Sequence, residues 1–313
     1  VWVISVFINT ILNYFYARKI VKFWFAWDFD YIKHIFKISV PYGIALFLSV
    51  VYFKMDIMIL SIMEEQTIAD RNISLYSLPM KIVEVIMVIW WFYMTSMLPS
   101  ITEAFKKKDE KTLTKLTDIS FKVLFMFSSM VFILWIMFRD YIIKIIANDD
   151  YLNVLPYSSS DAFLVVFAVI LFYFISLVFI YLFVASENQN KLLKINIIVT
   201  IFNFVGNILF IPKYSFMWAW FVTLLSQILL FILWYFWTKK LVKFNFSYKF
   251  LLSNIIFSTI IYFFWTYILK NFSFIWVYKY WLYIDFVLYW WIFFVIYMIF
   301  FYFIYKKFLK KIA

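Results

Sequence analysis

Apolar runs of membrane-spanning length follow one another along almost the whole chain and restrict it to one class of structure. About nine such runs of roughly 20 residues are present, and each could cross a hydrocarbon core of about 30 Å as a helix. The composition agrees, because 67% of the residues are hydrophobic and the mean hydropathy is +0.92. A transmembrane β-barrel would show short alternating segments instead. The sequence therefore predicts an all-α fold, a polytopic transmembrane helical bundle.

Charged residues gather between the apolar runs, and their sign alternates along the chain. Lys and Arg cluster at residues 18–22, 106–115, 191–194, 239–249 and 306–311, and acidic residues occupy the loops near 64–70 and 149–150. Cytoplasmic loops of membrane proteins carry an excess of Lys and Arg. The pattern therefore predicts that Lys107 and Lys240 are cytoplasmic and that Glu65 and Asp149 lie on the outer side. It also explains the net charge of +12 without a nucleic-acid partner.

The composition argues against several kinds of catalytic and metal site. The chain has no cysteine, which rules out disulfides, thiolate metal ligands and a cysteine nucleophile. Its one histidine, His34, lies in a polar connector, where a solvated surface side chain is the simpler interpretation. No nucleophile with an adjacent base and no cluster of metal ligands is visible in the sequence. We therefore expect neither a metal nor a cofactor.

Polar side chains follow one face of the apolar run at 196–211. Asn196, Thr200, Asn203 and Asn207 recur at i, i+4, i+7 and i+11, which places them on one side of a helix. Amides in hydrocarbon are costly unless they find partners or water. Two interpretations stay open: the amides hold one helix to another, or they line a transport path.

Four ionisable residues fall at a similar depth in two neighbouring runs: Lys54, Asp56, Lys81 and Glu84. Lys81 and Glu84 share a helix face, whereas Lys54 and Asp56, two residues apart, point in nearly opposite directions. A charge inside a membrane must be paired or wet. We therefore expect Asp56 to pair with Lys81, or Glu84 with a basic neighbour, and Asp56, Lys81 and Glu84 to face one interior cavity with the amide stripe. The alternative is that these side chains snorkel to the outer interface.

Four motifs in order resemble a known transporter family over about residues 38–238. The first is the N-x-x-x-N pair in the amide stripe, followed by I-P-K-Y at 211–214, where the chain is expected to fold back into a further apolar helix. The others are ISVPYG with YFKMDIMIL at 38–60, LYSLPMKIVE at 75–84 and NDDY at 148–151. Together they resemble the Wzx-like polysaccharide or O-antigen flippases of the multidrug/oligosaccharidyl-lipid/polysaccharide exporter superfamily.

This resemblance implies a transporter with two six-helix lobes around a central cavity that opens to each side in turn. The implied substrate is an undecaprenyl-pyrophosphate oligosaccharide, and the implied location is the bacterial cytoplasmic (inner) membrane, in lipopolysaccharide or other polysaccharide biosynthesis. Basic residues of the cavity, here Lys54 and Lys81, would hold the pyrophosphate, and the amides Asn196, Asn203 and Asn207 would contact sugar hydroxyls. If transport is coupled to an ion, that ion would be H⁺ or Na⁺.

Two alternative functions stay open. An integral-membrane glycan polymerase or ligase would be expected to show a sizeable outer loop with basic catalytic residues, and the outer loops of this sequence are short. A drug/cation antiporter of the same superfamily would favour carboxylates in the cavity over basic groups. The sequence has both kinds of residue.

The resemblance also divides the chain into four parts. Residues 1–24 would be the last helix of an incomplete N-terminal lobe, 25–37 a cytoplasmic amphipathic connector, 38–243 the C-terminal six-helix lobe, and 244–313 an additional helix pair with a basic tail. Because the sequence opens inside an apolar run without an initiator methionine, we expect an N-terminal part to precede it.

Glycine and tryptophan occur in unusual numbers, 2 and 15. Glycine normally makes up about 7% of a chain, and membrane helices use more of it than soluble ones. Trp218 and Trp220 stand where the resembling family usually has Gly-Ala-Ala, and Trp90 and Trp91 fall in the middle of an apolar run. Either some of these positions are glycine codons read with a different genetic code, or the chain has drifted toward aromatic residues in contact with lipid.

Overall fold

The computed structural model describes residues 2–21, 27–147, 149–152, 154, 157–243, 247–271, 279–304 and 306. Some predicted features lie outside these residues. They are Lys22, the boundary expected between residues 24 and 25, Asn148, and the basic tail from Lys307 onward.

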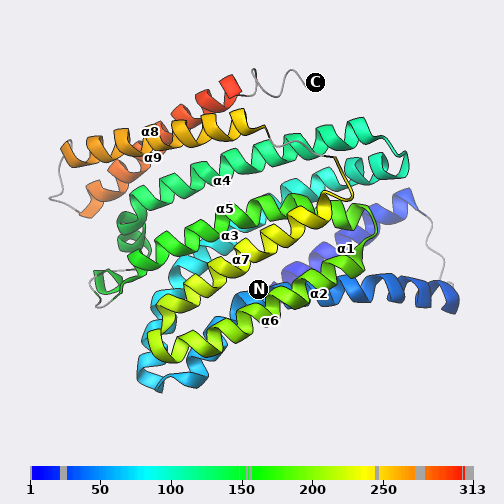
Figure 1. The fold of residues 1–313 in the computed structure, drawn as a ribbon, viewed down its shortest axis with the longest axis horizontal. Helices are drawn as coiled ribbons and strands as arrows, with labels where there is room; N and C mark the ends of the chain where they lie inside the picture. The colour runs from blue at the N-terminus through cyan, green and yellow to red at the C-terminus, as the bar shows by residue number, and fades with distance from the viewer. Residues whose placement is uncertain are drawn as a thin grey trace. The chain divides into compact units, whose positions relative to one another are not determined.

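Helices make up most of the described structure (Figure 1). They are α1 (Trp2–Ile20), α2 (Phe29–Met63), α3 (Gln66–Lys106), α4 (Glu110–Ile146), the 3-10 turn η1 (Asp149–Tyr151), α5 (Ser159–Ala185), α6 (Gln189–Tyr214), α7 (Phe216–Thr238), α8 (Tyr248–Asn271) and α9 (Lys279–Ile304). By length and composition, 7 described helices could cross a membrane: α2 to α7, and α8 over Tyr248–Tyr267. The apolar part described for α9, Val287–Phe303, is shorter. The predicted class, an all-α polytopic bundle, is confirmed.

The chain divides into two compact units, Val1–Val40 and Pro41–Ala313. The first holds α1 and the start of α2, and the second holds the rest of α2 with α3 to α9. Helix α2 begins at Phe29 and runs without a break through the described helical part of the connector predicted at 25–37. Residues 29–40 contain no glycine or proline that would end a helix.

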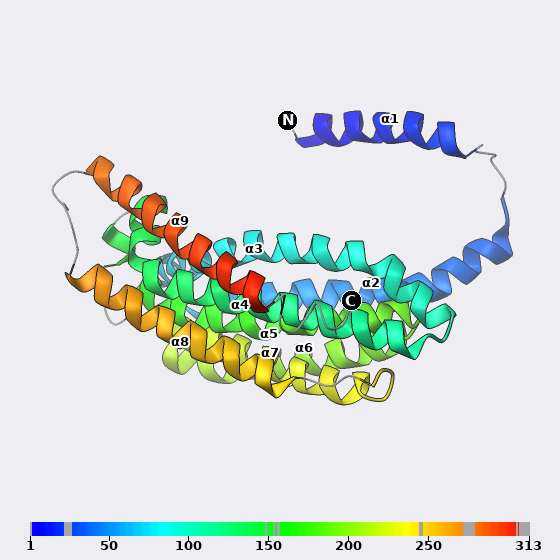
Figure 2. The same cartoon turned by 90° about the horizontal axis from the view of Figure 1, so that it is seen from above.

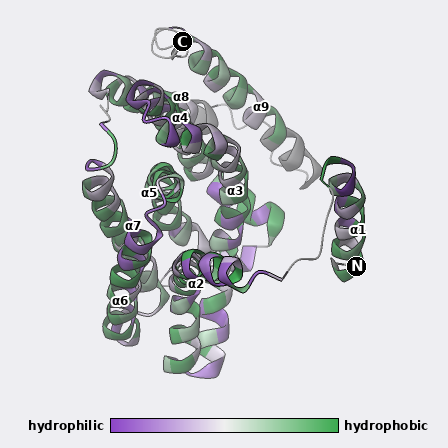
Figure 3. Cartoon of the chain, turned by 90° about the vertical axis from the view of Figure 1, so that its right-hand side faces the viewer, coloured by the Kyte–Doolittle hydropathy of each residue, from purple (hydrophilic) through white to green (hydrophobic). Residues whose placement is uncertain are grey.

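Helix α5 is the centre of the second unit. It packs against α3, α4 and α7, while α6 packs on α7, and α8 and α9 pack on α4 (Figures 1 and 2). A helix that is apolar on all sides, as α5 is, suits a position surrounded by other helices. Its start is fixed by a capping box in which Ser158 and Asp161 each accept a hydrogen bond from the other's backbone N–H. Many large hydrophobic side chains are also exposed on the bundle, as contact with lipid requires, and hydrophobic residues make up most of the helices (Figure 3).

Turns of the second unit use residues other than glycine in the left-handed backbone region. Lys108, Glu187 and Ser215 have φ of 53°, 58° and 56°. This conformation favours glycine, because a side chain crowds the following carbonyl oxygen. Ser215 is the turn between α6 and α7, one residue beyond the fold-back expected at 211–214, and Pro212 sits within the last turn of α6.

A buried hydrogen-bond network fixes the C-terminal helix pair to α4. Asn254 Nδ2 of α8 donates to Ser129 Oγ of α4 at 2.7 Å. The Tyr297 hydroxyl of α9 lies 2.7 Å from Ser258 Oγ and 3.3 Å from Ser129 Oγ. Because lipid offers polar groups no alternative partner, such contacts hold membrane helices in register. The α8–α9 pair is therefore anchored to the lobe by specific bonds as well as by packing.

Several buried tryptophans have no acceptor for the indole N–H among the described residues. They are Trp90, Trp220, Trp234 and Trp265. Buried indoles normally find a hydrogen-bond partner. Trp218 is half-buried and stacks on Phe210, with ring centroids 5.2 Å apart. Among the described residues, no hydrogen bond of the indole N–H therefore explains the presence of tryptophan at positions 90 and 220.

We predict that some tryptophan positions carry glycine in protein made by its natural host, with Trp218 the first candidate. The reason is the joint shortage of glycine and surplus of tryptophan. Peptide mass spectrometry of the natively expressed protein would decide between the two residues. Tryptophan at positions 218, 90 and 91 would contradict the prediction.

The positions of the turns permit a direct test of topology. The connections after α3, α5 and α7 lie at one end of the second unit, and those after α2, α4 and α6 at the other (Figure 1). Single cysteines can be introduced freely because the chain has none. A membrane-impermeant thiol reagent added from outside should label Cys at positions 65 and 149 and spare Cys at 107 and 240. Labelling of 65 and 107 from the same side would contradict the predicted orientation.

Candidate functional site

The amide stripe of α6 is buried and faces other helices rather than lipid. At its start, Asn196 Nδ2 donates to the Ala45 carbonyl oxygen at 2.8 Å and to Ser49 Oγ at 3.0 Å, both on α2. Further along, Asn203 Nδ2 donates to Ser226 Oγ of α7 at 3.1 Å, and Asn207 Nδ2 donates to Asn203 Oδ1 at 2.9 Å. The stripe therefore joins α6 to both α2 and α7.

Asp56 meets the same surface of α7 from the α2 side. Its side chain is fully buried, at 0% exposure. Thr223 Oγ1 donates to Asp56 Oδ2 at 3.4 Å, and the Ile57 backbone N–H donates to Oδ1 at 2.9 Å. One turn away, Gln227 Nε2 donates to the Tyr52 hydroxyl oxygen. We call the buried polar residues that join these three helices the α2–α6–α7 polar cluster. Its members are Tyr52, Asp56, Asn203, Asn207, Thr223, Ser226 and Gln227.

This cluster holds oxygen atoms that lack hydrogen-bond partners among the described residues. They are Asn207 Oδ1 and Gln227 Oε1, and Thr200 Oγ1 lies on the same face of α6. A buried acceptor without a donor is costly, so each is suited to a bound proton donor or cation. A carboxylate with amide and hydroxyl oxygens is the donor set that hard cations prefer. Among the described residues, no group of three or more His, Cys, Asp or Glu could hold a metal ion.

Lys54 and Glu84 form an ion pair between α2 and α3. Their side chains are 45% and 41% exposed, so the pair lies on the surface of the second unit. This confirms the expectation that Glu84 pairs with a basic neighbour. Lys81, one turn earlier on α3, is exposed and makes no ion pair with any described residue.

The expected pairing of Asp56 with Lys81 is wrong. The carboxylate of Asp56 is bonded to Thr223 inside the bundle, while Lys81 points outward from α3. Two residues along a helix is about 200° of rotation, so the face that brings Lys54 to α3 turns Asp56 toward α7. The predicted site residues therefore fall into two groups: Asp56 with the amides, and Lys81 beside the Lys54–Glu84 pair.

Sequence reasoning missed the contribution of α7. Thr223, Ser226 and Gln227 complete the cluster, and all are buried. Their spacing of i, i+3 and i+4 within an otherwise apolar helix is a recognisable one-face signal. Tyr52 was also missed, although it lies one turn before Asp56 on the same face of α2. The helix face shared by the uncharged polar residues of each span therefore predicts the contacts between spans, as the charged residues do.

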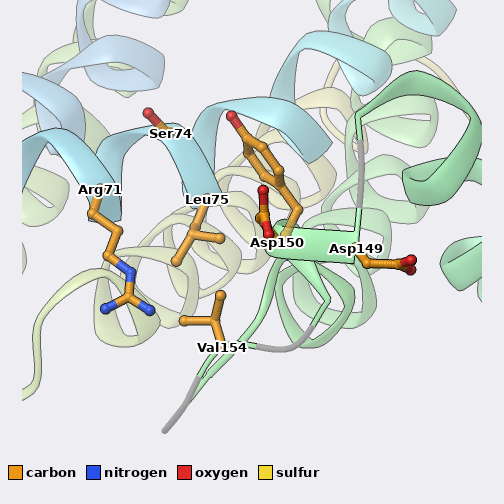
Figure 4. Close-up of a pocket in the computed structure, with 7 residues that line it drawn as sticks. Arg71, Ser74, Leu75, Asp149, Asp150 and Val154 are labelled. Atoms are coloured by element: carbon orange, nitrogen blue, oxygen red, sulfur yellow. The ribbon is translucent and has the colours of Figure 1, made fainter.

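A polar hollow of about 440 Å³ lies where the connection after α4 passes the start of α3 (Figure 4). Its lining residues are Arg71, Ser74, Leu75, Asp149, Asp150, Tyr151 and Val154. Asp149 Oδ1 is held by Lys144 Nζ at 3.1 Å. In Figure 4, Arg71 and the η1 residues lie on opposite sides of the hollow. Both signs of charge and an aromatic ring suit a hydroxyl-rich ligand more than an apolar one.

Comparison with known proteins identifies the family. The family model described as MatE matches residues 41–209, more than half of the chain. The chain belongs to the MatE family. The matched range contains α2 from Pro41, α3 to α5 and most of α6, and with them Asp56 and the amide stripe.

A solved structure shares the fold of this MatE protein. It is titled "Lipid II flippase MurJ, inward closed conformation", and it aligns with a TM-score of 0.61 and 16% sequence identity over 96% of this chain. The chain spans 61% of the MurJ chain. None of the curated proteins matches the sequence.

Family and fold together settle the class of protein. MatE proteins are membrane transporters, and 7 described helices are long and apolar enough for membrane spans. This MatE protein is therefore a multi-pass membrane protein of a transporter family and not an enzyme. The alternative of a membrane-embedded glycan polymerase or ligase is set aside.

Proposed function

We propose that this MatE protein translocates a lipid-linked oligosaccharide, an undecaprenyl-pyrophosphate glycan of polysaccharide or O-antigen biosynthesis, across the bacterial cytoplasmic membrane by alternating access. The observation that carries the proposal is the likeness of almost the whole chain to a lipid II flippase. Membership of the MatE family and the order of the Wzx-like motifs support it.

In this proposal the chain supplies one lobe of a two-lobe transporter. Residues 38–243 would form the six-helix C-terminal lobe, with α8 and α9 as an additional pair, and residues 1–24 would be the last helix of the other lobe. The continuous packing of α3 to α7 around α5 supports the first assignment, and the polar anchor between α4, α8 and α9 supports the second.

Lys81 is the proposed contact for the pyrophosphate. It is an exposed cation that no described carboxylate neutralises, whereas Lys54 is paired with Glu84. A charge-assisted hydrogen bond to phosphate contributes about 1.5–3 kcal/mol, so its loss should weaken substrate binding roughly 10- to 150-fold. Lys81→Ala should therefore abolish glycan export, and Lys81→Arg, which keeps the charge, should retain much of it.

Translocation of a fluorescent lipid-linked oligosaccharide in proteoliposomes would measure this effect. Lys106→Ala is the matched control, because it removes an exposed lysine at the other end of the same helix. Membrane fractionation would show that each variant inserts. Normal export by Lys81→Ala would mean that Lys81 only snorkels. Efflux of cationic drugs without any glycan translocation would favour the drug/cation antiporter instead.

The α2–α6–α7 polar cluster is the proposed coupling site for Na⁺ or H⁺. Asp56 supplies the negative charge, and the orphan oxygens of Asn207 and Gln227 supply the remaining acceptors. The cluster joins three helices, so occupation by an ion would favour one arrangement of α2 against α6 and α7. An ion that binds one arrangement more tightly shifts the equilibrium toward it, which is how an ion gradient could drive alternating access.

A further inference from the structure

A basic pocket lies at the end of the second unit where α7 ends and α4 begins. Its volume is about 210 Å³. The lining residues are Glu110, Leu113, Thr114, Lys239, Lys240, Leu241, Val242 and Lys243. It contains neither Asp56, Lys81 nor any residue of the amide stripe, so it is separate from the proposed transport and coupling sites.

Backbone contacts hold the lysines of this pocket in place. After α7, the N–H groups of Leu241 and Val242 both donate to the Thr238 carbonyl oxygen, at 2.8 and 3.0 Å. Thr114 Oγ1 of α4 donates to the Lys243 carbonyl oxygen at 2.9 Å, and the Val242 side chain is buried. The lysines of the pocket therefore lie in a turn that hydrogen bonds fix to the end of α7 and to the first turns of α4, and not in a flexible tail.

The charges of the pocket are only partly balanced. Lys243 Nζ lies 3.6 Å from Glu110 Oε2, which neutralises one lysine. Lys239 and Lys240 are exposed and make no ion pair with any described residue. Three lysines against one glutamate leave an excess of positive charge around a hollow with polar walls. Such a hollow fits an anion with several oxygen acceptors, of which a phosphate group is the common biological example.

The position of the pocket relative to the membrane surface indicates which molecule would supply the phosphate group. Tyr235 and Trp237, in the last turn of α7, precede the lysines, and Tyr and Trp concentrate at the membrane–water interface. The basic loop also belongs to the side predicted to be cytoplasmic. We propose that this pocket binds the phosphate headgroup of an anionic phospholipid of the cytoplasmic leaflet, with Lys239 and Lys240 as its main contacts.

Native mass spectrometry of the full chain in detergent, titrated with phosphatidylglycerol or phosphatidylcholine, would test the proposal. Each lysine near a membrane surface is worth about fivefold in affinity for acidic lipid. The double variant Lys239→Gln/Lys240→Gln should therefore bind phosphatidylglycerol about 25-fold more weakly, and Lys239→Arg/Lys240→Arg should bind it nearly as well as the unchanged protein. The matched control is Lys191→Gln/Lys194→Gln, which removes two lysines from the start of α6.

Each outcome bears on the proposal. Selective loss in the Lys239/Lys240 glutamine variant, with unchanged thermal unfolding, supports it. Equal loss in the α6 control shows only diffuse charge attraction and overturns it. Displacement of the lipid by millimolar inorganic phosphate or pyrophosphate would assign the pocket to a soluble anion and overturn the lipid assignment. Equal affinity for phosphatidylcholine would also overturn it, whatever the variants do.

Discussion

Asp56→Asn should abolish Na⁺- or H⁺-coupled transport while leaving the protein folded. The substitution removes the only acidic side chain of the α2–α6–α7 polar cluster, and the new amide oxygen can still accept from Thr223. Without the carboxylate, no negative charge offsets the cost of dehydrating a cation in a buried site. Loss of an outer-shell partner alone typically weakens ion binding about 10- to 100-fold, so loss of the one charged group of the site should weaken ion binding at least this much and uncouple the ion gradient from the helix arrangement.

Thermal unfolding in detergent would measure this change directly. An ion at 100 times its Kd stabilises the folded state by about 2.7 kcal/mol, and a 100-fold weaker site would leave about 0.4 kcal/mol at the same concentration. Asp70→Asn is the matched control, because Asp70 is an exposed carboxylate at the start of α3. Full Na⁺ stabilisation of Asp56→Asn would show that the cluster only joins helices. If Na⁺ stabilises neither the unchanged protein nor Asp56→Asn, and Asp56→Asn loses proton-driven transport, the coupling ion is H⁺.

The features predicted correctly from the sequence are those that one helix or one pair of neighbours determines. Apolar runs fix the class of fold, because lipid leaves the backbone no other partner than its own helix. The expectation that Glu84 pairs with a basic neighbour needed only two adjacent spans, and the structure provides Lys54. The amide stripe needed only the helical period, and the structure buries it against α2 and α7.

The features that the sequence could not supply depend on how each helix is rotated about its axis. Asp56 and Lys54 lie on opposite faces of α2, and only packing against α3 and α7 decides which face is buried. The sequence alone left Asp56 free to meet Lys81, because both were at a similar depth. Thr223 and Gln227 were overlooked for the same reason: a short polar face acquires meaning only when another helix presents a complementary one.

Gly206→Leu should produce the largest loss of stability of any single change considered for this protein. Gly206 lies on α6 between Asn203 and Asn207, where α6 crosses α7. A Cβ atom at this position would lie 2.9 Å from Val222 Cγ1. Val222 is buried and β-branched, so its side chain has little freedom to turn away. Overpacking of this kind costs about 1–3 kcal/mol, and the larger leucine should reach or exceed the upper value.

The effect should extend from stability to the coupling site, because Val222 directly precedes Thr223. Helices forced apart here would stretch the bond from Asn203 to Ser226, which is 3.1 Å long. A double-mutant cycle that combines the milder Gly206→Ala with Val222→Ala tests whether the steric contact between these two residues causes the loss of stability. Val222→Ala removes the two methyl groups nearest to the new Cβ, so it should restore both thermal stability and Na⁺ binding to Gly206→Ala. If the two substitutions destabilise additively, the contact is not the cause, and the close approach of α6 to α7 does not shape the site.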